Sequence, residues 1–388
     1  MSMNTLYQPF IERFEESSNP VRTFYAPGRV NLIGDHTDYC GGLVFPCAID
    51  RGTTVMIRKR DDDTVKLAST NFELMASLSP AELNQKYGDN WINYVLGVID
   101  QFRKRGIETT GFECLYSGNI PNGGGLSSSA SLEVVTAFAL NSLFGAGFDD
   151  IELVRIALAA ENEFVGVNCG IMDQYAVAMA QKDHAMMLDC NTLECEQTPL
   201  KLDGYQIVIV NSNQRRDLVD SKYNERFQEC QTATRDLSKH LNIKQLAEVT
   251  PAQMKDSLEY FSSIDVAKRA KHVITEHNRV REAVIALNAD DLETFGRLMN
   301  ESHKSMSEDF EASTDIIDQL VAISLDTPGV IGARMTGGGF GGCTVNLVAE
   351  AQVEHFIESV GKRYREACGL KADFYPTQSD NGMREITE

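Results

Sequence analysis

Residues 28–42 read Gly28-Arg29-Val30-Asn31-Leu32-Ile33-Gly34-Asp35-His36-Thr37-Asp38-Tyr39-Cys40-Gly41-Gly42. They combine a guanidinium, two carboxylates, an imidazole and a phenol with glycine turns. Such a density of directional donors and acceptors suits a ligand with many hydroxyl groups, since each buried hydroxyl needs a partner. A polar turn explains any one of these residues but not the whole set. His36 and Asp38 could also ligate a metal, but no further histidine cluster supports that alternative.

A second glycine-rich segment reads Pro121-Asn122-Gly123-Gly124-Gly125-Leu126-Ser127-Ser128-Ser129-Ala130-Ser131. Consecutive glycines allow backbone N–H groups to turn towards one point. The apolar residues that follow recur at helical spacing, and a helix N-terminus attracts anions through its free N–H groups and dipole. The segment is therefore a candidate phosphate loop, although it lacks the lysine of a Walker A loop. The alternative is a helix whose first turn is capped by serine.

A third segment is Gly337-Gly338-Gly339-Phe340-Gly341-Gly342. It satisfies the pattern Gly-x-Gly-x-x-Gly, but a β-rich run follows it where a dinucleotide-binding fold requires a helix. Five glycines among six residues indicate that the backbone approaches another group closely. By itself, a turn connecting two strands explains this segment as well as a ligand loop does.

The composition restricts the class of protein. The chain has 388 residues, and 36 basic against 56 acidic side chains give a formal net charge of −20. This balance argues against nucleic-acid binding, which requires clustered Lys and Arg. No apolar run is long enough to span a membrane, and the first residues show no secretory signal. The nine cysteines are scattered without a Cys-x-x-Cys pair, as expected of reduced thiols in a cytoplasmic enzyme.

The hydrophobic pattern predicts an α+β fold. We expect strands at 53–57, 112–116, 206–210, 343–348 and 372–375, and helices at 131–143, 150–163 and 353–364. A helical stripe runs from Tyr223 to Leu241, and residues 250–325 read as largely helical. The length favours two domains. Because the strand at 206–210 begins a second unit, we place the boundary near residue 195, with domains at 1–195 and 196–388.

The three glycine segments, in this order, resemble the three motifs of the GHMP small-molecule kinases. The first is similar to the signature of the galactokinase family, and the resemblance extends from about residue 20 to Gly342. It implies a two-domain GHMP kinase fold with the active site in the interdomain cleft. It also implies ATP-dependent phosphorylation of galactose at its anomeric hydroxyl, with Mg²⁺ as cofactor. We expect galactose and ATP as small-molecule partners, without nucleic acid, membrane or an obligate protein partner.

The resemblance assigns roles residue by residue. It implies that Asp173 is the catalytic aspartate and that Arg29 lies beside the transferred phosphoryl group. Ser129 and Glu161 match the magnesium ligands. The nucleotide phosphate loop would comprise Gly123, Gly124, Gly125, Leu126, Ser127, Ser128 and Ser129. The sugar contacts would be Asp35, His36, Thr37, Asp38, Gly170 and Tyr223. The adenine side would include Ser69, Trp91 and Tyr94, although both aromatic residues could equally belong to the core.

One residue departs from the family pattern. Asp35 stands where the family usually has glutamate, and its side chain is shorter by one bond of about 1.5 Å. We expect weakened or altered recognition at the far end of the sugar. Related alternatives are a kinase for N-acetylgalactosamine or arabinose, and a sugar sensor that regulates transcription. The complete serine loop and the presence of Asp173 favour an enzyme over a sensor, and a dehydrogenase is the weakest alternative.

Overall fold

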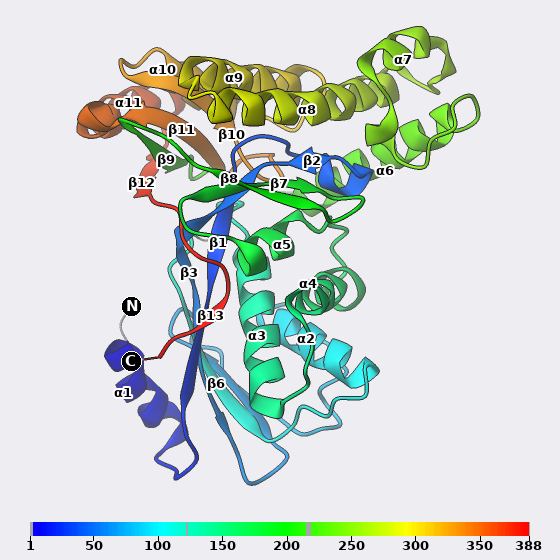
Figure 1. Cartoon of the computed structure of the whole chain (residues 1–388). Coiled ribbons are helices and arrows are strands. Elements are labelled where there is room, and N and C mark those ends of the chain that lie inside the picture. Colours follow the sequence, from blue (N-terminus) through cyan, green and yellow to red (C-terminus); the bar gives the residue numbers. More distant parts are fainter. Residues whose placement is uncertain (1–2, 122, 215–218, 388) are drawn as a thin grey trace.

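The lower half of the molecule in Figure 1 is built on a six-stranded sheet. The computed structural model describes residues 3–121, 123–214 and 219–387. The strand order in this sheet is β13-β1-β3-β6-β4-β5. The bounds are β1 (Arg22–Asn31), β3 (Pro46–Lys59), β4 (Val65–Ser69), β5 (Ala76–Leu78), β6 (Phe112–Gly118) and β13 (Arg384–Glu385). The predicted strands at 53–57 and 112–116 lie in β3 and β6 and are confirmed.

One face of this sheet is covered by helices and the other is largely open (Figure 1). The covering helices are α2 (Ile92–Lys104), α3 (Ser128–Phe144), α4 (Asp150–Ala159) and α5 (Met172–Met179). Their apolar side chains and those of the sheet form the largest buried cluster of the described residues. A short helix, α1 (Met3–Phe14), packs on the opposite face against β3 and β6. The helix predicted at 131–143 is confirmed within α3.

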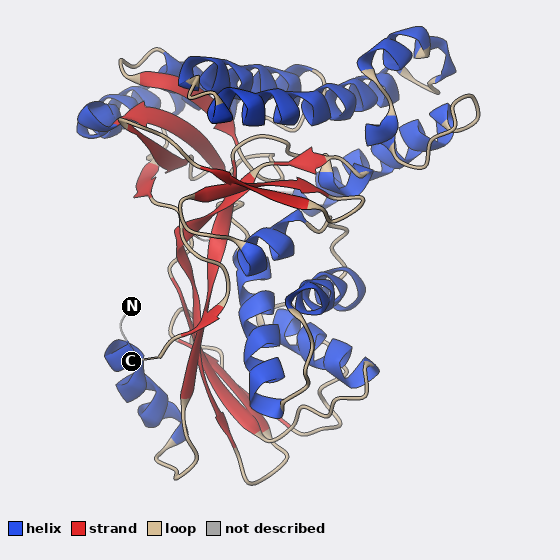
Figure 2. Cartoon of the chain, in the orientation of Figure 1, coloured by secondary structure: helices blue, strands red, loops and turns tan. Residues whose placement is uncertain are grey.

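The upper half contains a four-stranded antiparallel sheet with helices over it (Figures 1 and 2). The strand order is β10 (Val330–Met335), β11 (Cys343–Ala349), β9 (Tyr205–Asn211) and β12 (Asp373–Thr377). The helices of this half are α6 (Val219–Leu237), α7 (Pro251–Asp256), α8 (Ile264–Asn288), α9 (Leu292–Glu308), α10 (Asp315–Leu325) and α11 (Val353–Cys368). The strands predicted at 206–210, 343–348 and 372–375 overlap β9, β11 and β12. Helix α6 ends at Leu237, so the helix predicted from Tyr223 to Leu241 ends earlier than expected.

Side-chain caps define where several of these helices begin. Thr250 forms a capping box with Gln253 at α7. Ser263, Asp291 and Thr314 each accept a backbone N–H at the start of α8, α9 and α10. Such caps satisfy N–H groups that have no partner within the helix. The largely helical character predicted for 250–325 is therefore confirmed.

A small sheet and the C-terminal segment connect the two halves. The small sheet has the order β2 (Leu43–Val44), β7 (His184–Asp189) and β8 (Cys195–Pro199). The chain then builds the upper half and returns, so that β13 pairs with β1 in the lower sheet. The lower sheet thus combines strands from the beginning and from the end of the chain. The domain boundary near residue 195 stays a prediction.

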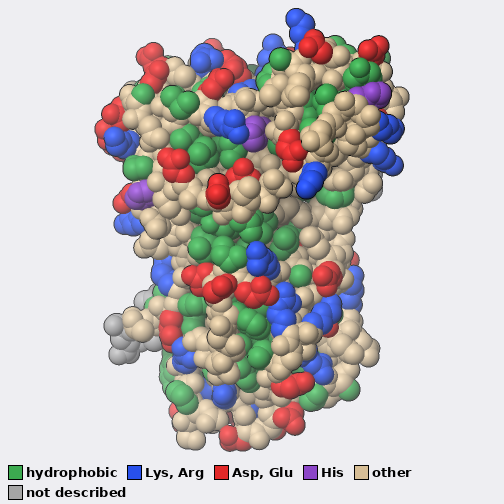
Figure 3. Space-filling view, turned by 45° about the vertical axis from the view of Figure 1, so that its right-hand side comes forward, with side chains coloured by type: hydrophobic (Ala, Val, Ile, Leu, Met, Phe, Trp, Pro, Cys, Tyr) green, Lys and Arg blue, Asp and Glu red, His purple; other side chains and the backbone are tan. Residues whose placement is uncertain are grey.

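The surface bears charges of both signs. On the face shown in Figure 3, acidic and basic side chains of the described residues are interspersed rather than gathered into one basic patch. All nine cysteines are free thiols. None of the described helices is both long enough and apolar enough to cross a bilayer.

Candidate active site

The three glycine segments converge at the N-terminus of α3. Arg29, at the end of β1, donates its backbone N–H to the Leu126 carbonyl at 3.3 Å and its Nη1 to the Gly125 carbonyl at 2.7 Å. Gly337 lies on the other side of the same loop with a φ of 80°, and a Cβ there would stand 2.6 Å from the Gly125 oxygen. Only glycine tolerates both this conformation and this contact. The three glycine segments, which are remote in sequence, therefore meet at this point.

Asp173, in the first turn of α5, lies at the centre of this convergence. Its Oδ1 accepts hydrogen bonds from Arg29 Nε at 2.9 Å and Nη2 at 2.6 Å, and its Oδ2 lies 2.7 Å from Nη2. The Ser127 hydroxyl donates to Oδ2 at 2.6 Å. Arg29 is 3% exposed, whereas the Asp173 side chain is 27% exposed. The carboxylate is therefore held in a fixed orientation yet stays accessible to a ligand.

Ser127 does not cap α3, contrary to the alternative raised for this segment. It adopts a left-handed conformation, with φ 61° and ψ 44°, and its side chain makes no capping hydrogen bond. A non-glycine residue in this region is strained, and such strain concentrates at functional sites. The conformation turns the hydroxyl towards Asp173, whereas Ser128 and Ser129 are among the lining residues of a second cavity.

A cavity of about 370 Å³ opens in front of Asp173, between the two halves of the chain. We call it the acidic cavity, because five carboxyl side chains are among the residues that line it. The lining residues are Arg29, Asp35, His36, Asp38, Asp89, Tyr94, Glu161, Val165, Gly166, Val167, Cys169, Gly170, Met172, Asp173, Tyr223, Asn224, Gly337 and Gly338. All but one of the predicted sugar-contact residues are in this set.

The exception is Thr37. It is fully buried, and its hydroxyl lies 2.8 Å from the Gly34 carbonyl and 2.7 Å from the Leu43 carbonyl. These bonds hold the turn that presents the neighbouring residues to the cavity. The Thr37 hydroxyl thus acts within the turn, and the expected sugar contact of Thr37 stays a prediction.

Asp35 lies at the inner end of the acidic cavity and is 1% exposed. Its Oδ2 accepts a hydrogen bond from Arg334 Nη2 at 2.6 Å, and its Oδ1 accepts one from Asn31 Nδ2 at 2.8 Å. Burial raises the pKa of Asp35, although the Arg334 guanidinium opposes that rise. Both oxygens are thus already engaged by protein donors, which leaves limited capacity for a sugar hydroxyl.

His36 and two tyrosines form an aromatic group at the side of the acidic cavity. His36 Nδ1 lies 2.8 Å from the Tyr39 hydroxyl, and its ring centroid is 5.3 Å from that of Tyr223. Burial lowers the pKa of His36 to about 3, so the ring is neutral near pH 7. Gly338 packs against the Tyr223 ring, where a Cβ would lie 3.3 Å away.

Asp38 and Gly170 lie against each other in the lining of the acidic cavity. A Cβ at Gly170 would stand 2.2 Å from Asp38 Oδ2, so only glycine allows this carboxylate its position. Loss of hydration and the nearby Asp173 carboxylate raise the pKa of Asp38 to about 7. Asp38 therefore changes its charge in the neutral pH range.

Glu161 lies in a π-helical turn, Ala160–Val165, that continues α4. Such turns are frequent at functional sites. Glu161 is 6% exposed, and the Ser129 hydroxyl forms a hydrogen bond with its carboxylate. Gln174 Nε2 donates to Glu161 Oε2 at 2.6 Å and to Glu133 Oε2 at 3.2 Å. Burial raises the pKa of Glu161 and that of the fully buried Glu133.

The Ser129 hydroxyl and the Glu161 carboxylate are hard oxygen donors of the kind that Mg²⁺ prefers. Mg²⁺ keeps several waters and commonly takes its remaining oxygens from substrate phosphates, so a site with few protein ligands fits this ion. Among the described residues, no group of three or more His, Cys, Asp or Glu is placed to hold a metal. The alternative of a metal site at His36 and Asp38 therefore gains no support.

A second cavity, of about 200 Å³, lies on the other side of the α3 N-terminus. We call it the aromatic cavity, and it shares Tyr94 with the acidic cavity. Its lining residues are Thr53, Ser69, Asn71, Phe72, Trp91, Tyr94, Tyr116, Gly118, Ile120, Ser128, Ser129 and Leu132. The three residues predicted for the adenine side, together with Ser128 and Ser129, are thus brought together here.

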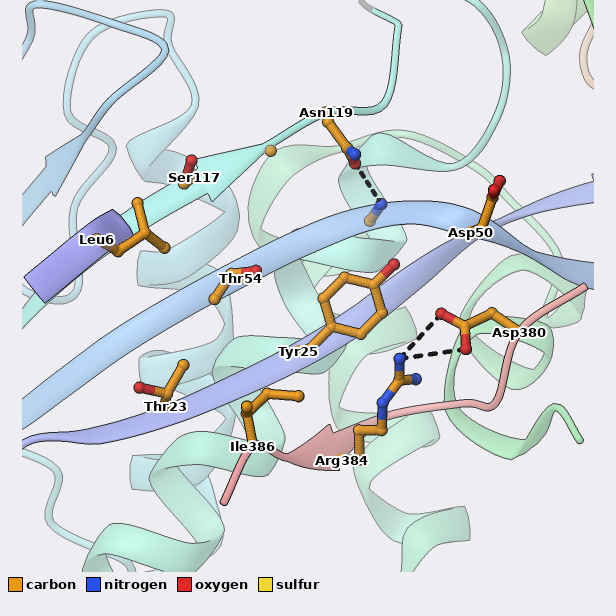
Figure 4. A pocket seen from close by; sticks show the side chains of 12 residues that line it. Leu6, Thr23, Tyr25, Asp50, Thr54, Ser117, Asn119, Asp380, Arg384 and Ile386 are labelled. Atoms are coloured by element: carbon orange, nitrogen blue, oxygen red, sulfur yellow. Dashed lines mark hydrogen bonds and ion pairs between the residues drawn. The ribbon is translucent and has the colours of Figure 1, made fainter. Parts of the chain in front are cut away.

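A third cavity, of about 230 Å³, lies on the face of the lower sheet that carries α1 (Figure 4). Tyr25 projects from β1 into it, and the guanidinium of Arg384 of β13 stacks over the Tyr25 ring, 4.5 Å from its centroid. Arg384 also pairs with Asp380 at 2.9 Å. No predicted site residue lines this cavity, so we do not assign the active site to it.

Sequence reasoning missed three residues that support the site. Gln174 and Glu133 connect α5 and α3 to Glu161, and Arg334 of β10 fixes Asp35 from a fully buried position. A signal existed for two of them. Glu133 and Arg334 are charged residues within otherwise apolar stretches, and a buried charge requires a partner. Their partners, however, lie far away in sequence.

Comparisons with known proteins agree with this geometry. The sequence model described as the galactokinase galactose-binding signature matches residues 8–59. The models of the GHMP kinases N terminal domain and the GHMP kinases C terminal match residues 93–181 and 283–366. A galactokinase of Clostridium acetobutylicum is 47% identical over 388 residues, which cover 99% of each chain. A galactokinase of Bacillus subtilis is 45% identical over 369 residues, covering 94% of this chain and 95% of the relative.

Comparison with solved structures also finds a galactokinase among the similar proteins. The crystal structure of Lactococcus lactis galactokinase complexed with galactose superposes with a TM-score of 0.97 at 41% identity, covering 99% of this chain and 100% of that chain. A mevalonate kinase superposes with a TM-score of 0.68 at 21% identity, covering 93% of this chain and 99% of that one, and this likeness concerns the fold alone. The fold and the three loops define a GHMP kinase. Within that class, the chain belongs to the galactokinase family of ATP-dependent sugar kinases.

Proposed function

We propose that this protein transfers the γ-phosphoryl group of ATP to the anomeric hydroxyl of α-D-galactose, giving α-D-galactose 1-phosphate and ADP. The observation that carries the proposal is the position of Ser127, Ser128 and Ser129. Ser127 is hydrogen-bonded to Asp173, which lines the acidic cavity, whereas Ser128 and Ser129 line the aromatic cavity. A nucleotide in the aromatic cavity would direct its terminal phosphate across the helix N-terminus towards a sugar in the acidic cavity.

The nucleotide phosphates lie, in this proposal, over the glycine loop at 123–125 and the first turn of α3. Free N–H groups and the helix dipole attract anions at this position. The net charge of −20 does not oppose this local effect, because surface carboxylates are screened beyond about 8 Å at physiological salt. Ser129 and Glu161 would hold Mg²⁺, which neutralises phosphate charge when bound.

Asp173 orients the anomeric hydroxyl and accepts its proton. As the bond between the sugar O1 and the γ-phosphorus forms, the bond between that phosphorus and the bridging oxygen of ADP breaks. The O1 proton passes to the Asp173 carboxylate. Phosphoryl transfer has a loose transition state, so positioning and charge neutralisation contribute more than a strong base does. Arg29 contributes to both positioning and charge neutralisation, because it fixes Asp173 and places its guanidinium next to the phosphate loop.

The remaining polar residues of the acidic cavity hold the sugar. Asp35, His36 and Asp38 supply acceptors and donors from the first loop, while Gly170 and Tyr223 close the sides. Such a ring of directional groups matches a monosaccharide, whose hydroxyls each need a partner once buried. The nine free thiols accord with a reducing compartment, and we propose that the enzyme acts in the cytoplasm.

The test is ADP release, coupled to a reporter reaction, with galactose, N-acetylgalactosamine, arabinose and glucose compared side by side. We expect the highest kcat/KM with galactose. A higher kcat/KM with N-acetylgalactosamine or arabinose would redirect the proposal to that sugar. Binding of ATP and galactose without any ADP release would instead indicate a sensor.

A further inference from the structure

The aromatic cavity has one fixed aromatic wall. Trp91 precedes α2, packs against the core of the lower half and contacts Tyr116 edge-on at a centroid distance of 5.6 Å. The Tyr116 hydroxyl is in turn 3.0 Å from the Thr136 hydroxyl of α3. Contacts from a strand and a helix therefore hold the Trp91 ring in one orientation at the edge of the cavity.

Phe72 supplies a second aromatic ring on the same cavity, and nothing in the reasoning above uses it. Its ring is nearly parallel to that of Trp91, with an angle of 17° between the planes and 6.4 Å between the centroids. A flat ring between two others needs two contacts of about 3.5 Å, or about 7 Å in all. The gap between the two ring planes is at most the centroid distance, so it is short of that by at least roughly half an ångström, and Phe72 must move outward to admit a third ring.

The chain around Phe72 permits such a movement. The segment is anchored before it, where Asn71 exchanges hydrogen bonds of 2.9 and 2.8 Å with the backbone of Gly118. Beyond this anchor three apolar side chains are exposed, with Phe72 at 46%, Leu74 at 37% and Met75 at 43%. Exposed apolar side chains gathered in one place indicate a contact surface rather than random scatter. Only Phe72 of the three lines the aromatic cavity.

We propose that Phe72 closes over the face of the nucleotide base that Trp91 leaves exposed, so that the base is held between one fixed and one movable ring. The proposal rests on the proposed function, which places the phosphates at Ser128 and Ser129 on the same cavity. The base then lies at the end of the aromatic cavity that Trp91 and Phe72 line. Stacking selects for flat, polarisable ring area, so the enzyme prefers purine to pyrimidine nucleoside triphosphates. Phe72 is thus a residue for nucleotide affinity and selectivity and takes no part in phosphoryl transfer.

The chain offers a direct reporter, because Trp91 is its single tryptophan. Titration of the full-length protein with ADP should quench the fluorescence of Trp91. In Phe72→Ala we expect the quenching to persist, with a Kd for ADP raised at least about fivefold, the lower range of base–aromatic stacking. The KM for ATP should rise by a similar factor, while kcat and the KM for galactose stay unchanged. The ratio of kcat/KM for ATP to that for CTP should fall.

Two further variants make the test specific. Phe72→Tyr keeps an aromatic ring and should restore the Kd and the KM for ATP to within about twofold of the wild type, since stacking needs only the ring face. Met75→Ala removes a neighbouring exposed side chain that does not line the cavity and should change neither value. An unchanged Kd in Phe72→Ala, or an equal change in Met75→Ala, would overturn the proposal. If the wild type then still phosphorylated galactose, the proposed function would stand without it.

Discussion

Replacement of Asp173 by asparagine separates the chemistry of this enzyme from its ligand binding. The side chain keeps its size but loses its negative charge. In the structure the carboxylate accepts hydrogen bonds from two nitrogens of Arg29 and from the Ser127 hydroxyl, all between 2.6 and 2.9 Å. The amide oxygen of asparagine can retain the two bonds that Arg29 donates to Oδ1, and the serine hydroxyl can rotate to accept from the amide nitrogen, whereas the bond from Nη2 to Oδ2 is lost. The cavity should therefore keep its shape.

The expected loss is confined to turnover. A positioned general base contributes about 10²–10⁴-fold, which is about 2.7–5.4 kcal/mol of activation free energy. We therefore expect kcat to fall at least about 100-fold in Asp173→Asn, while the Kd for galactose and for ADP changes less than about threefold, since general-base catalysis acts on the transition state alone. Ser127→Ala, which removes one hydrogen bond worth about 1 kcal/mol, should lower kcat only about fivefold.

The assays are coupled ADP release for kcat and calorimetric titration for binding of each ligand. A kcat for Asp173→Asn within tenfold of the wild type would refute the role of the carboxylate as proton acceptor. An equal loss of galactose affinity and turnover would assign Asp173 to sugar binding alone. The thermal unfolding midpoint of each variant shows whether the fold is retained.

Three further predictions concern the sugar and the metal. Asp35→Glu should lower the KM for galactose about fivefold, by one added hydrogen bond of about 1 kcal/mol; an unchanged or raised KM would contradict this. Because the pKa of Asp38 is raised to about 7, its carboxyl loses a proton as the pH rises through neutrality, and the anion accepts sugar hydroxyls better. The KM for galactose should fall between pH 6 and 8, and Asp38→Asn should abolish that slope. Gln174→Leu removes the amide that holds Glu161, so the Mg²⁺ concentration for half-maximal activity should rise about 10-fold, with a parallel loss of Mn²⁺ affinity by electron paramagnetic resonance; an unchanged Mn²⁺ affinity would argue against this role.

Much of the fold could be predicted from local patterns. Alternating and continuous apolar runs located strands in both halves, and helical spacing located α3 and α11, because these signals depend on neighbours along the chain. The return of β13 to the sheet of β1 had no such signal. It joins residues Tyr25 and Arg384, and pairing at such a separation depends on the closure of the whole chain.

The candidate site, like the fold, could be predicted only in part from the sequence. The glycine loops were visible because glycine marks special backbone conformations, but the direction of each side chain was not. Ser127 was a candidate cap until its left-handed backbone turned the hydroxyl towards Asp173. Thr37 belongs to the same motif as its neighbours, yet its hydroxyl stays inside the turn. Arg334 and Asp35 are 299 residues apart, so their ion pair required the folded structure.

The central claim is that the N-terminus of α3 separates a sugar from a nucleotide whose terminal phosphate faces Asp173. The most direct measurement is a crystal structure of the protein with galactose and a non-hydrolysable ATP analogue. We predict the anomeric O1 within hydrogen-bonding distance of the Asp173 carboxylate, about 2.5–3.0 Å, and the base in the aromatic cavity. Galactose bound in the cavity beside Tyr25, or with another hydroxyl facing Asp173, would contradict the account.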